Sequence, residues 1–217
     1  MRFTRAAWIG LILGVATIAL GAQQPRPHSR VFPPEELGSL APPDRDAWQQ
    51  SDRIMDALGI ADRDKVADVG AGGGWFTTRL ARRVGPNGRV YAEDINPTML
   101  SSIDRAATRE GLKNIEPTLG TATDPRLPAG LQAVLMVGAY PYLEDPVAML
   151  RNISKSLAPH GRLGIVDFKN DGAGGPGPAL EARVDEDVVM RDAVAAGLTL
   201  GSKETFLRYQ YLLVFTK

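Results

Sequence analysis

An α/β fold with a mainly parallel sheet covered by helices is predicted by three features of the sequence. From Trp48 onward, strand-like apolar segments alternate with segments of helical periodicity. The stretch Leu131–Gly138 is almost continuously apolar, as expected for a strand that is covered on both faces. A glycine-rich turn follows the first predicted strand and opens a helix. The 217 residues suffice for one domain with a sizeable core.

Local signals set the limits of the predicted elements. Pro97 opens one helix and Gly111 follows its end, while Gly59 and Gly197 follow two others. The predicted helices are Asp46–Leu58, Trp75–Val84, Pro97–Glu110, Pro146–Leu157 and Asp185–Ala196. The predicted strands are Lys65–Gly70, Arg89–Ile95, Ile115–Gly120, Leu131–Gly138, Arg162–Lys169, Thr199–Leu207 and Tyr211–Thr216.

The last two predicted strands constrain the topology. The link between them, Arg208–Gln210, is long enough for a hairpin but too short for a parallel crossover. The last strand should therefore run antiparallel to its neighbour in a sheet that is otherwise parallel.

The N-terminal segment is expected to lie outside the fold. Arg2 and Arg5 precede an uninterrupted apolar run, Trp8–Leu20, which resembles an export signal. Cleavage after Gly21 would place Ala19 at the −3 position. Residues 1–22 are interpreted as a cleaved signal peptide or as a membrane anchor through residues 8–20, and both imply an exported or inner-membrane-attached protein. A proline-rich linker, 23–45, then leads to a domain at 46–217.

Composition excludes several kinds of function. The chain has no cysteine and two histidines, which excludes disulfides, cysteine nucleophiles and thiolate or histidine-rich metal sites. Its 25 Lys and Arg balance its 25 Asp and Glu, so bulk charge does not indicate nucleic acid as a partner. We expect a small-molecule ligand and no metal, and the oligomeric state stays open.

The turn Asp68–Gly74, with the sequence DVGAGGG, carries the functional signal. Glycines let the backbone turn tightly and approach a ligand that a Cβ atom would block. A dinucleotide fingerprint starting at Gly70 would need glycine at position 75, where Trp75 stands, so a nicotinamide oxidoreductase is disfavoured. The carboxylate of Asp68 suits an ammonium group, which a pyrophosphate ligand lacks.

Two further acids follow the next predicted strands. Asp94, at the tip of the second strand, can accept hydrogen bonds from both ribose hydroxyls and is favoured over its neighbour Glu93. Asp124 follows the third strand and can accept from an adenine amine. Ligands of open α/β sheets bind at the carboxyl ends of the strands, where all these acids should gather.

The segments VADVGAGGGWFTTRLA, VYAEDINPTML, GTATDPRLP, VLMVGAYPYLEDP and LAPHGRLGIVDF resemble, in order and spacing, the motifs of class I S-adenosylmethionine-dependent methyltransferases. The similarity is greatest to the small-molecule branch with ubiquinone/menaquinone C-methyltransferases. It implies a Rossmann-like seven-stranded sheet in the order 3-2-1-4-5-7-6, with helices on both faces and S-adenosylmethionine as cofactor. The cofactor-binding residues it implies are Asp68, Gly70, Ala71, Gly72, Gly74, Trp75, Asp94, Ile95 and Asp124.

The acceptor side departs from that branch. Gln132 stands where an acid is usual, and Pro141 stands where histidine is common. Tyr140, Tyr142 and Asp167 are the candidates for a catalytic base. The resemblance implies in-line methyl transfer to an unidentified small molecule, and the departures leave open an exported nucleoside-binding protein without transferase activity.

Overall fold

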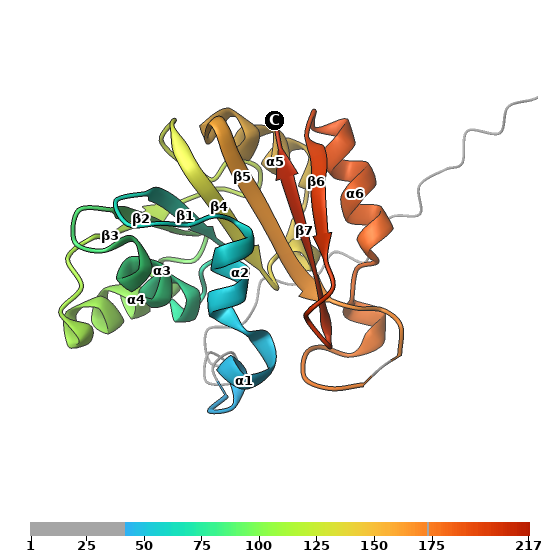
Figure 1. Ribbon diagram of the computed structural model, residues 1–217, viewed down its shortest axis with the longest axis horizontal. Coiled ribbons are helices and arrows are strands. Elements are labelled where there is room, and N and C mark those ends of the chain that lie inside the picture. Colours follow the sequence, from blue (N-terminus) through green and yellow to red (C-terminus); the bar gives the residue numbers. More distant parts are fainter. Residues whose placement is uncertain (1–41, 173) are drawn as a thin grey trace, which may run out of the picture.

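The computed structural model describes residues 42–172 and 174–217, so the predicted leader and the linker up to residue 41 lie outside the described residues. Seven strands form one sheet in the order β3-β2-β1-β4-β5-β7-β6 (Figure 1). This is the predicted order. The strands are β1 (Lys65–Val69), β2 (Arg89–Asp94), β3 (Ile115–Leu119), β4 (Leu131–Val137), β5 (Leu157–Phe168), β6 (Thr199–Glu204) and β7 (Gln210–Thr216).

Strands β1 to β5 are parallel, and β7 runs antiparallel to both of its neighbours, β5 and β6. The antiparallel last strand that the short final link predicts is thus confirmed. Its direction brings the first residue of β7 to the sheet edge where β1 to β5 end, because Phe168 at the end of β5 pairs with Gln210.

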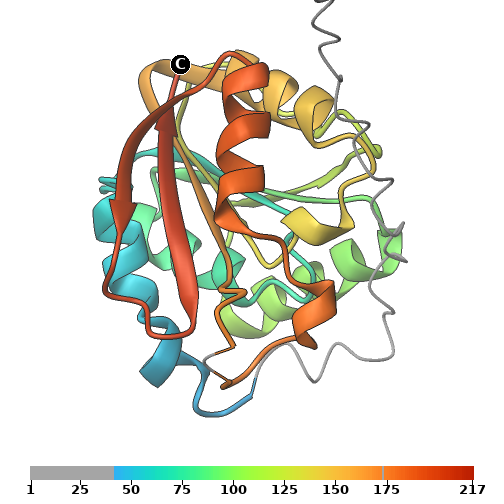
Figure 2. The same cartoon turned by 90° about the vertical axis from the view of Figure 1, so that its right-hand side faces the viewer.

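Helices cover both faces of the sheet (Figures 1 and 2). They are α1 (Arg45–Gln49), α2 (Ser51–Ala57), α3 (Trp75–Val84), α4 (Pro97–Glu110), α5 (Pro146–Ser156) and α6 (Glu186–Ala195), with short 3-10 helices η2 (Tyr140–Tyr142) and η3 (Leu180–Ala182). Within the described part of the chain, no helix is both long and apolar enough to cross a membrane.

Two buried clusters, one on each face, hold the layers together. Side chains of α2 and α3, including Ile54 and Leu80, pack on one face of the central strands. Side chains of α5 and α6, including Leu150 and Val189, pack on the other. Because β4 is apolar on both faces, it contributes to both clusters, which explains its continuous apolar sequence.

The predicted single helix Asp46–Leu58 is wrong, because the chain forms two short helices that break at Gln50. Gln50 adopts a left-handed conformation with φ 51°. Its side-chain amide donates to the carbonyl of Phe206, 3.1 Å away, which holds the break in place. The break turns α1 away from the axis of α2, toward the carboxyl ends of the strands (Figure 1).

Two further boundaries differ from prediction. Strand β5 begins at Leu157 instead of Arg162, because Leu157 is already extended and pairs with Leu131 of β4 ahead of an irregularity in the register. The final hairpin link is longer than expected, since β6 ends at Glu204 and β7 begins at Gln210.

Asn114 connects the end of α3 to the start of β3 through two hydrogen bonds. Its buried side-chain amide donates to the carbonyls of Ala81 and Gly85, both at 2.8 Å. We expect Asn114→Ala to lower the free energy of unfolding by about 2 kcal/mol, because two carbonyls lose a buried donor. Urea denaturation measures the change. Lys113→Ala, at the exposed neighbouring position, is the control, and equal losses for both variants would contradict this role.

Candidate active site

A cavity of about 540 Å³ opens at the carboxyl ends of the parallel strands. In Figure 1 the carboxyl ends of β4 and β5 point down, where α1 and the segment between β5 and α6 also lie. The cavity passes from the glycine turn after β1 and the tip of β2 to the ends of β4 and β5 and the start of β7. Its position is the one predicted for the ligand of an open α/β sheet.

The glycine turn after β1 has the backbone geometry that its sequence predicts. Gly70, Gly72 and Gly74 have φ angles of 67°, 54° and 84°, which side-chain-bearing residues rarely adopt. A Cβ atom on Gly70 would lie 2.4 Å from the Cβ atom of Ala139 in the loop after β4. Glycine is therefore required at position 70 by conformation and by space.

The two acids at the end of β2 hold this turn. The amide of Gly70 donates to Glu93 Oε2 at 3.2 Å, and the amide of Gly72 donates to Asp94 Oδ2 at 2.9 Å. The amide of Ala71 donates to the Glu93 carbonyl at 2.9 Å. Three consecutive residues of the turn are thus fixed by two consecutive residues of the neighbouring strand.

Asp94 and its neighbours fit a nucleoside. Each carboxylate oxygen of Asp94 accepts one backbone N–H, Oδ1 from Asn96 and Oδ2 from Gly72, which leaves a second lone pair on each for ribose hydroxyls. Burial raises the pKa of Asp94, and these amides oppose the rise. Ile95 and Met99 also line the cavity, and the Ile95 side chain is 41% exposed, which suits an adenine ring.

Asp68 and Trp75 lie on a second cavity of about 440 Å³ on the outer side of the glycine turn. Burial raises the pKa of Asp68 to about 6, against a hydrogen bond from the Thr77 hydroxyl at 2.6 Å and the charge of Arg45. At neutral pH Asp68 is therefore mostly ionised and suits an ammonium group. The Trp75 ring contacts two guanidinium groups, those of Arg45 at 4.2 Å and Arg79 at 3.5 Å.

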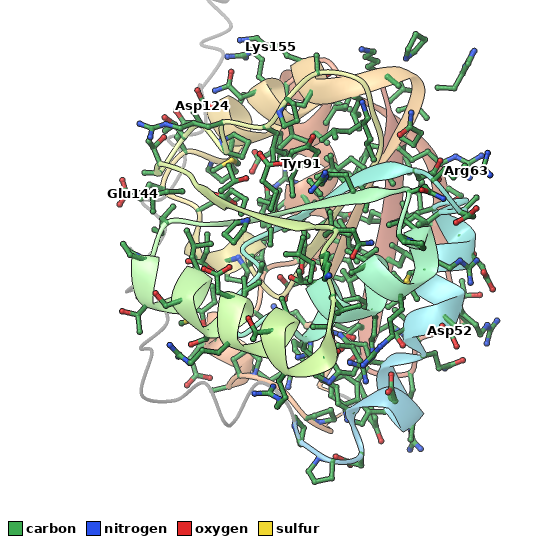
Figure 3. The ribbon with its side chains drawn as sticks, turned by 90° about the vertical axis from the view of Figure 1, so that its left-hand side faces the viewer. Asp52, Arg63, Tyr91, Asp124, Glu144 and Lys155 are labelled. Atoms are coloured by element: carbon green, nitrogen blue, oxygen red, sulfur yellow. The ribbon has the colours of Figure 1, made fainter. Side chains whose placement is uncertain are left out.

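Asp124 is not brought together with the other predicted site residues. It lines neither cavity, its side chain is exposed, and its Oδ1 accepts from the backbone of Arg126 at 2.8 Å. Figure 3 shows it at the surface, on the opposite side of the sheet from α4. The charge of Asp124 is still close enough to contribute to the raised pKa of Glu93.

The three candidate bases lie in different surroundings. Tyr140 is fully buried in the cluster under α5 and α6, where its hydroxyl donates to Asp192 at 2.5 Å, and it does not line the cavity. Tyr142 lines the cavity beside Pro141. Asp167 also lines it, at the end of β5, and is 1% exposed.

Several site residues escape prediction from sequence. Arg45, assigned to the linker, is the first residue of α1 and lines both cavities. Burial lowers its pKa to about 10, so it remains charged at neutral pH. Gln49 and Gln210 are each 1% exposed and line the main cavity. The sequence offered only a weak signal for Gln210, a polar residue directly before the apolar run of β7.

The departure at Gln132 does not touch the site. Gln132 lies near the start of β4, where the parallel strands begin and away from the cavity at their carboxyl ends. Its Oε1 accepts from the Lys65 amide at 2.8 Å. An amide oxygen makes this bond as a carboxylate would. Only the departure at Pro141 falls on the cavity.

Glu93 makes the stability of the folded protein depend on pH. Burial raises its pKa from 4.5 to about 8, against the Gly70 N–H bond and with help from the neighbouring acids. Between pH 4.5 and about pH 8 the Glu93 carboxyl is ionised in the unfolded chain but protonated in the folded protein. The free energy of unfolding therefore falls as pH rises through this range. We expect wild type to lose up to about 1.4 kcal/mol per pH unit relative to Glu93→Gln in this window.

Chemical denaturation of both proteins between pH 5 and pH 8 measures this difference. Glu116→Gln, at an exposed position of β3, is the matched control and should follow wild type. Parallel curves for wild type and Glu93→Gln would show that Glu93 keeps its ordinary ionisation in the folded protein.

Comparison with known proteins finds similarity to methyltransferases. The Methyltransferase domain family matches residues 66–161. Nocamycin O-methyltransferase from Saccharothrix syringae is 31% identical over 117 residues, which cover 52% of this chain and 41% of that protein. A ubiquinone/menaquinone biosynthesis C-methyltransferase from Pasteurella multocida is 31% identical over 122 residues, which cover 52% and 43%. The matches therefore span less than half of either relative.

The structural comparison extends further along the chain. A SAM-dependent methyltransferase from Aquifex aeolicus superposes with a TM-score of 0.80 and 25% identity, over 85% of this chain and 98% of the other. The strand order is the one that the motif resemblance implies. The strand order and these similarities show that the described domain has the fold of class I S-adenosylmethionine-dependent methyltransferases, and that its residues 66–161 match the Methyltransferase domain family.

Proposed function

We propose that the protein transfers the methyl group of S-adenosylmethionine to a small-molecule acceptor. The observation that carries this proposal is a single cavity that joins the nucleoside cradle to an apolar chamber. The cradle occupies the ends of β1 and β2, while the chamber lies over β4, β5 and β7. This arrangement suits two ligands held side by side.

The chemistry asks little of the protein beyond alignment. S-adenosylmethionine supplies a sulfonium-activated methyl group, so an acceptor aligned in line with it needs no further activation of the donor. Asp94, Ile95 and the glycine turn would hold the nucleoside and the methionine moiety. The loop at Pro141 and Tyr142 and helix α1 line the chamber, where they would help to exclude water once both ligands are bound.

The chamber walls favour a flat, largely apolar acceptor. Trp48 of α1 and Phe168 of β5 line it as a tilted aromatic pair with ring centroids 6.0 Å apart, and Pro141, Tyr142 and Pro178 add to the lining. Such surfaces recognise rings by stacking and shape. The two curated relatives are named for methyl transfer to oxygen and to carbon, and the apolar walls alone do not choose between these.

The cofactor half can be tested by titration calorimetry with S-adenosylhomocysteine, S-adenosylmethionine and NAD. We expect binding of the first two only, and a loss of about 30-fold or more in affinity for S-adenosylhomocysteine in Asp94→Asn and Asp94→Ala, because the carboxylate accepts the ribose hydroxyls. Asp104→Ala, on the exposed face of α4, should bind as wild type.

The outcomes separate the alternatives. Binding of S-adenosylmethionine with no methyl transfer to any acceptor would favour a nucleoside-binding protein. Unchanged affinity in folded Asp94 variants would remove the basis of the proposal. Binding of NAD alone would point to an oxidoreductase.

We also propose that residues 1–22 direct the chain out of the cytoplasm. The basic start and the apolar run Trp8–Leu20 support this. Sequencing the N-terminus of protein from fractionated cells checks it: a start at Ala22 indicates a cleaved signal, and an intact Met1 in the membrane fraction indicates an anchor. An intact chain in the cytoplasm would contradict both.

A further inference from the structure

The acceptor half of the cavity contains two buried polar atoms that have no partner. Among the described residues, three buried side-chain atoms lack a hydrogen bond: Glu93 Oε1, Asp167 Oδ2 and Gln210 Nε2. The first belongs to the cofactor half. Asp167 and Gln210 line the chamber and are each 1% exposed. Unsatisfied buried polar atoms are rare because each costs stability, so two in one chamber point to a ligand.

A chain of hydrogen bonds fixes the unpaired atom of Gln210 as a donor. Arg45 Nε, which can only donate, bonds to Gln49 Oε1 at 2.5 Å. This fixes the orientation of the Gln49 amide, whose Nε2 then donates to Gln210 Oε1 at 2.9 Å. The NH₂ group of Gln210 is therefore the atom left for the chamber, and it requires an acceptor atom on the ligand.

Asp167 presents the complementary group. Its Oδ1 accepts from the Phe168 amide at 2.8 Å, which leaves Oδ2 for a ligand. Burial raises the pKa of Asp167 to about 7, while the nearby Arg183 charge and the amides of Phe168 and Tyr140 oppose the rise. The Tyr211 hydroxyl, which lies within electrostatic reach of Asp167, donates to the Val184 carbonyl at 3.2 Å. Asp167 can thus take up a proton near neutral pH.

The position of Asp167 suits a reacting group. It follows Val166, whose carbonyl accepts from Gly138 at 2.9 Å, so it lies beside the tip of β4. Gly138 lines the same cavity, next in the sheet to the glycine turn after β1. The carboxylate therefore stands on the chamber side of the cofactor cradle.

We propose that Asp167 Oδ2 and Gln210 Nε2 recognise an aromatic or otherwise flat acceptor that carries a hydroxyl group and a separate carbonyl oxygen, and that the hydroxyl is the site of methylation. The inference rests on the proposed function and adds the class of acceptor. Gln210 donates to the carbonyl oxygen, and the hydroxyl donates to Asp167. Trp48 and Phe168 supply the apolar walls for the ring.

The reaction balances without a further reagent. The acceptor oxygen forms a bond to the methyl carbon as the C–S bond breaks, and the electron pair of that bond stays on sulfur. The hydroxyl proton passes to Asp167 Oδ2 and then to solvent. The products are a methyl ether and a neutral thioether.

Three two-ring probes test the pair by calorimetry in the presence of saturating S-adenosylhomocysteine. 7-Hydroxycoumarin carries both groups, coumarin lacks the hydroxyl, and 2-naphthol lacks the carbonyl. We expect 7-hydroxycoumarin to bind about tenfold more tightly than either of the others, because each lost bond leaves a buried group unpaired. With S-adenosylmethionine, mass spectrometry should detect the methyl ether of 7-hydroxycoumarin.

Matched variants assign each bond. Asp167→Asn should bind 7-hydroxycoumarin no more tightly than coumarin, but still more tightly than 2-naphthol. Gln210→Met should bind 7-hydroxycoumarin no more tightly than 2-naphthol, but still more tightly than coumarin. Both should retain wild-type affinity for S-adenosylhomocysteine, which also shows that they are folded. Asp104→Asn, on the exposed face of α4, should preserve both preferences.

Failure of this inference differs from failure of the proposed function. If S-adenosylhomocysteine does not bind wild type, the proposed function is wrong. If it binds but the three probes bind equally or none binds, the recognition pair is refuted. Loss of both preferences in either variant would equally refute the separate assignments.

Discussion

The site depends on the hydrogen bonds by which β2 grips the turn after β1. Backbone N–H groups of Gly70 and Gly72 are held by the side chains of Glu93 and Asp94, while Ala71 is held by the Glu93 carbonyl. Without these bonds the glycines of the turn would have wide conformational freedom. Asp94 thus organises the surface that receives a nucleoside and also offers its own lone pairs to it.

The order of strands then divides the cavity into a cofactor half and an acceptor half. Strands β2 and β1 present acids and glycine backbone, which suit a hydrogen-bonding nucleoside. Strands β4, β5 and β7 present apolar side chains with a few buried polar atoms, which suit an uncharged ring. The reversed direction of β7 matters here, because it brings the start of that strand, and Gln210, to the edge where the parallel strands end.

Local signals account for what was predictable. Helices α3 and α4 have the predicted bounds because glycine and proline at their ends act within one turn. Asp94 lies on the cavity, as its place at a strand tip predicts. The break at Gln50 was missed because the Phe206 carbonyl that holds it lies 156 residues away. Likewise, Gln49 and Gln210 meet across 161 residues, so neither looks special in its own neighbourhood.

Arg45 lines both cavities, so its position bears on binding in each. Its guanidinium lies within electrostatic reach of Asp68 on one side and bonds to Gln49 on the other. If a ligand in one cavity draws Arg45 toward the glycine turn, the amides of Gln49 and Gln210 lose the bond that orients them. Thermodynamic reciprocity then requires each ligand to change the affinity of the other by the same factor, so the two would bind cooperatively or antagonistically.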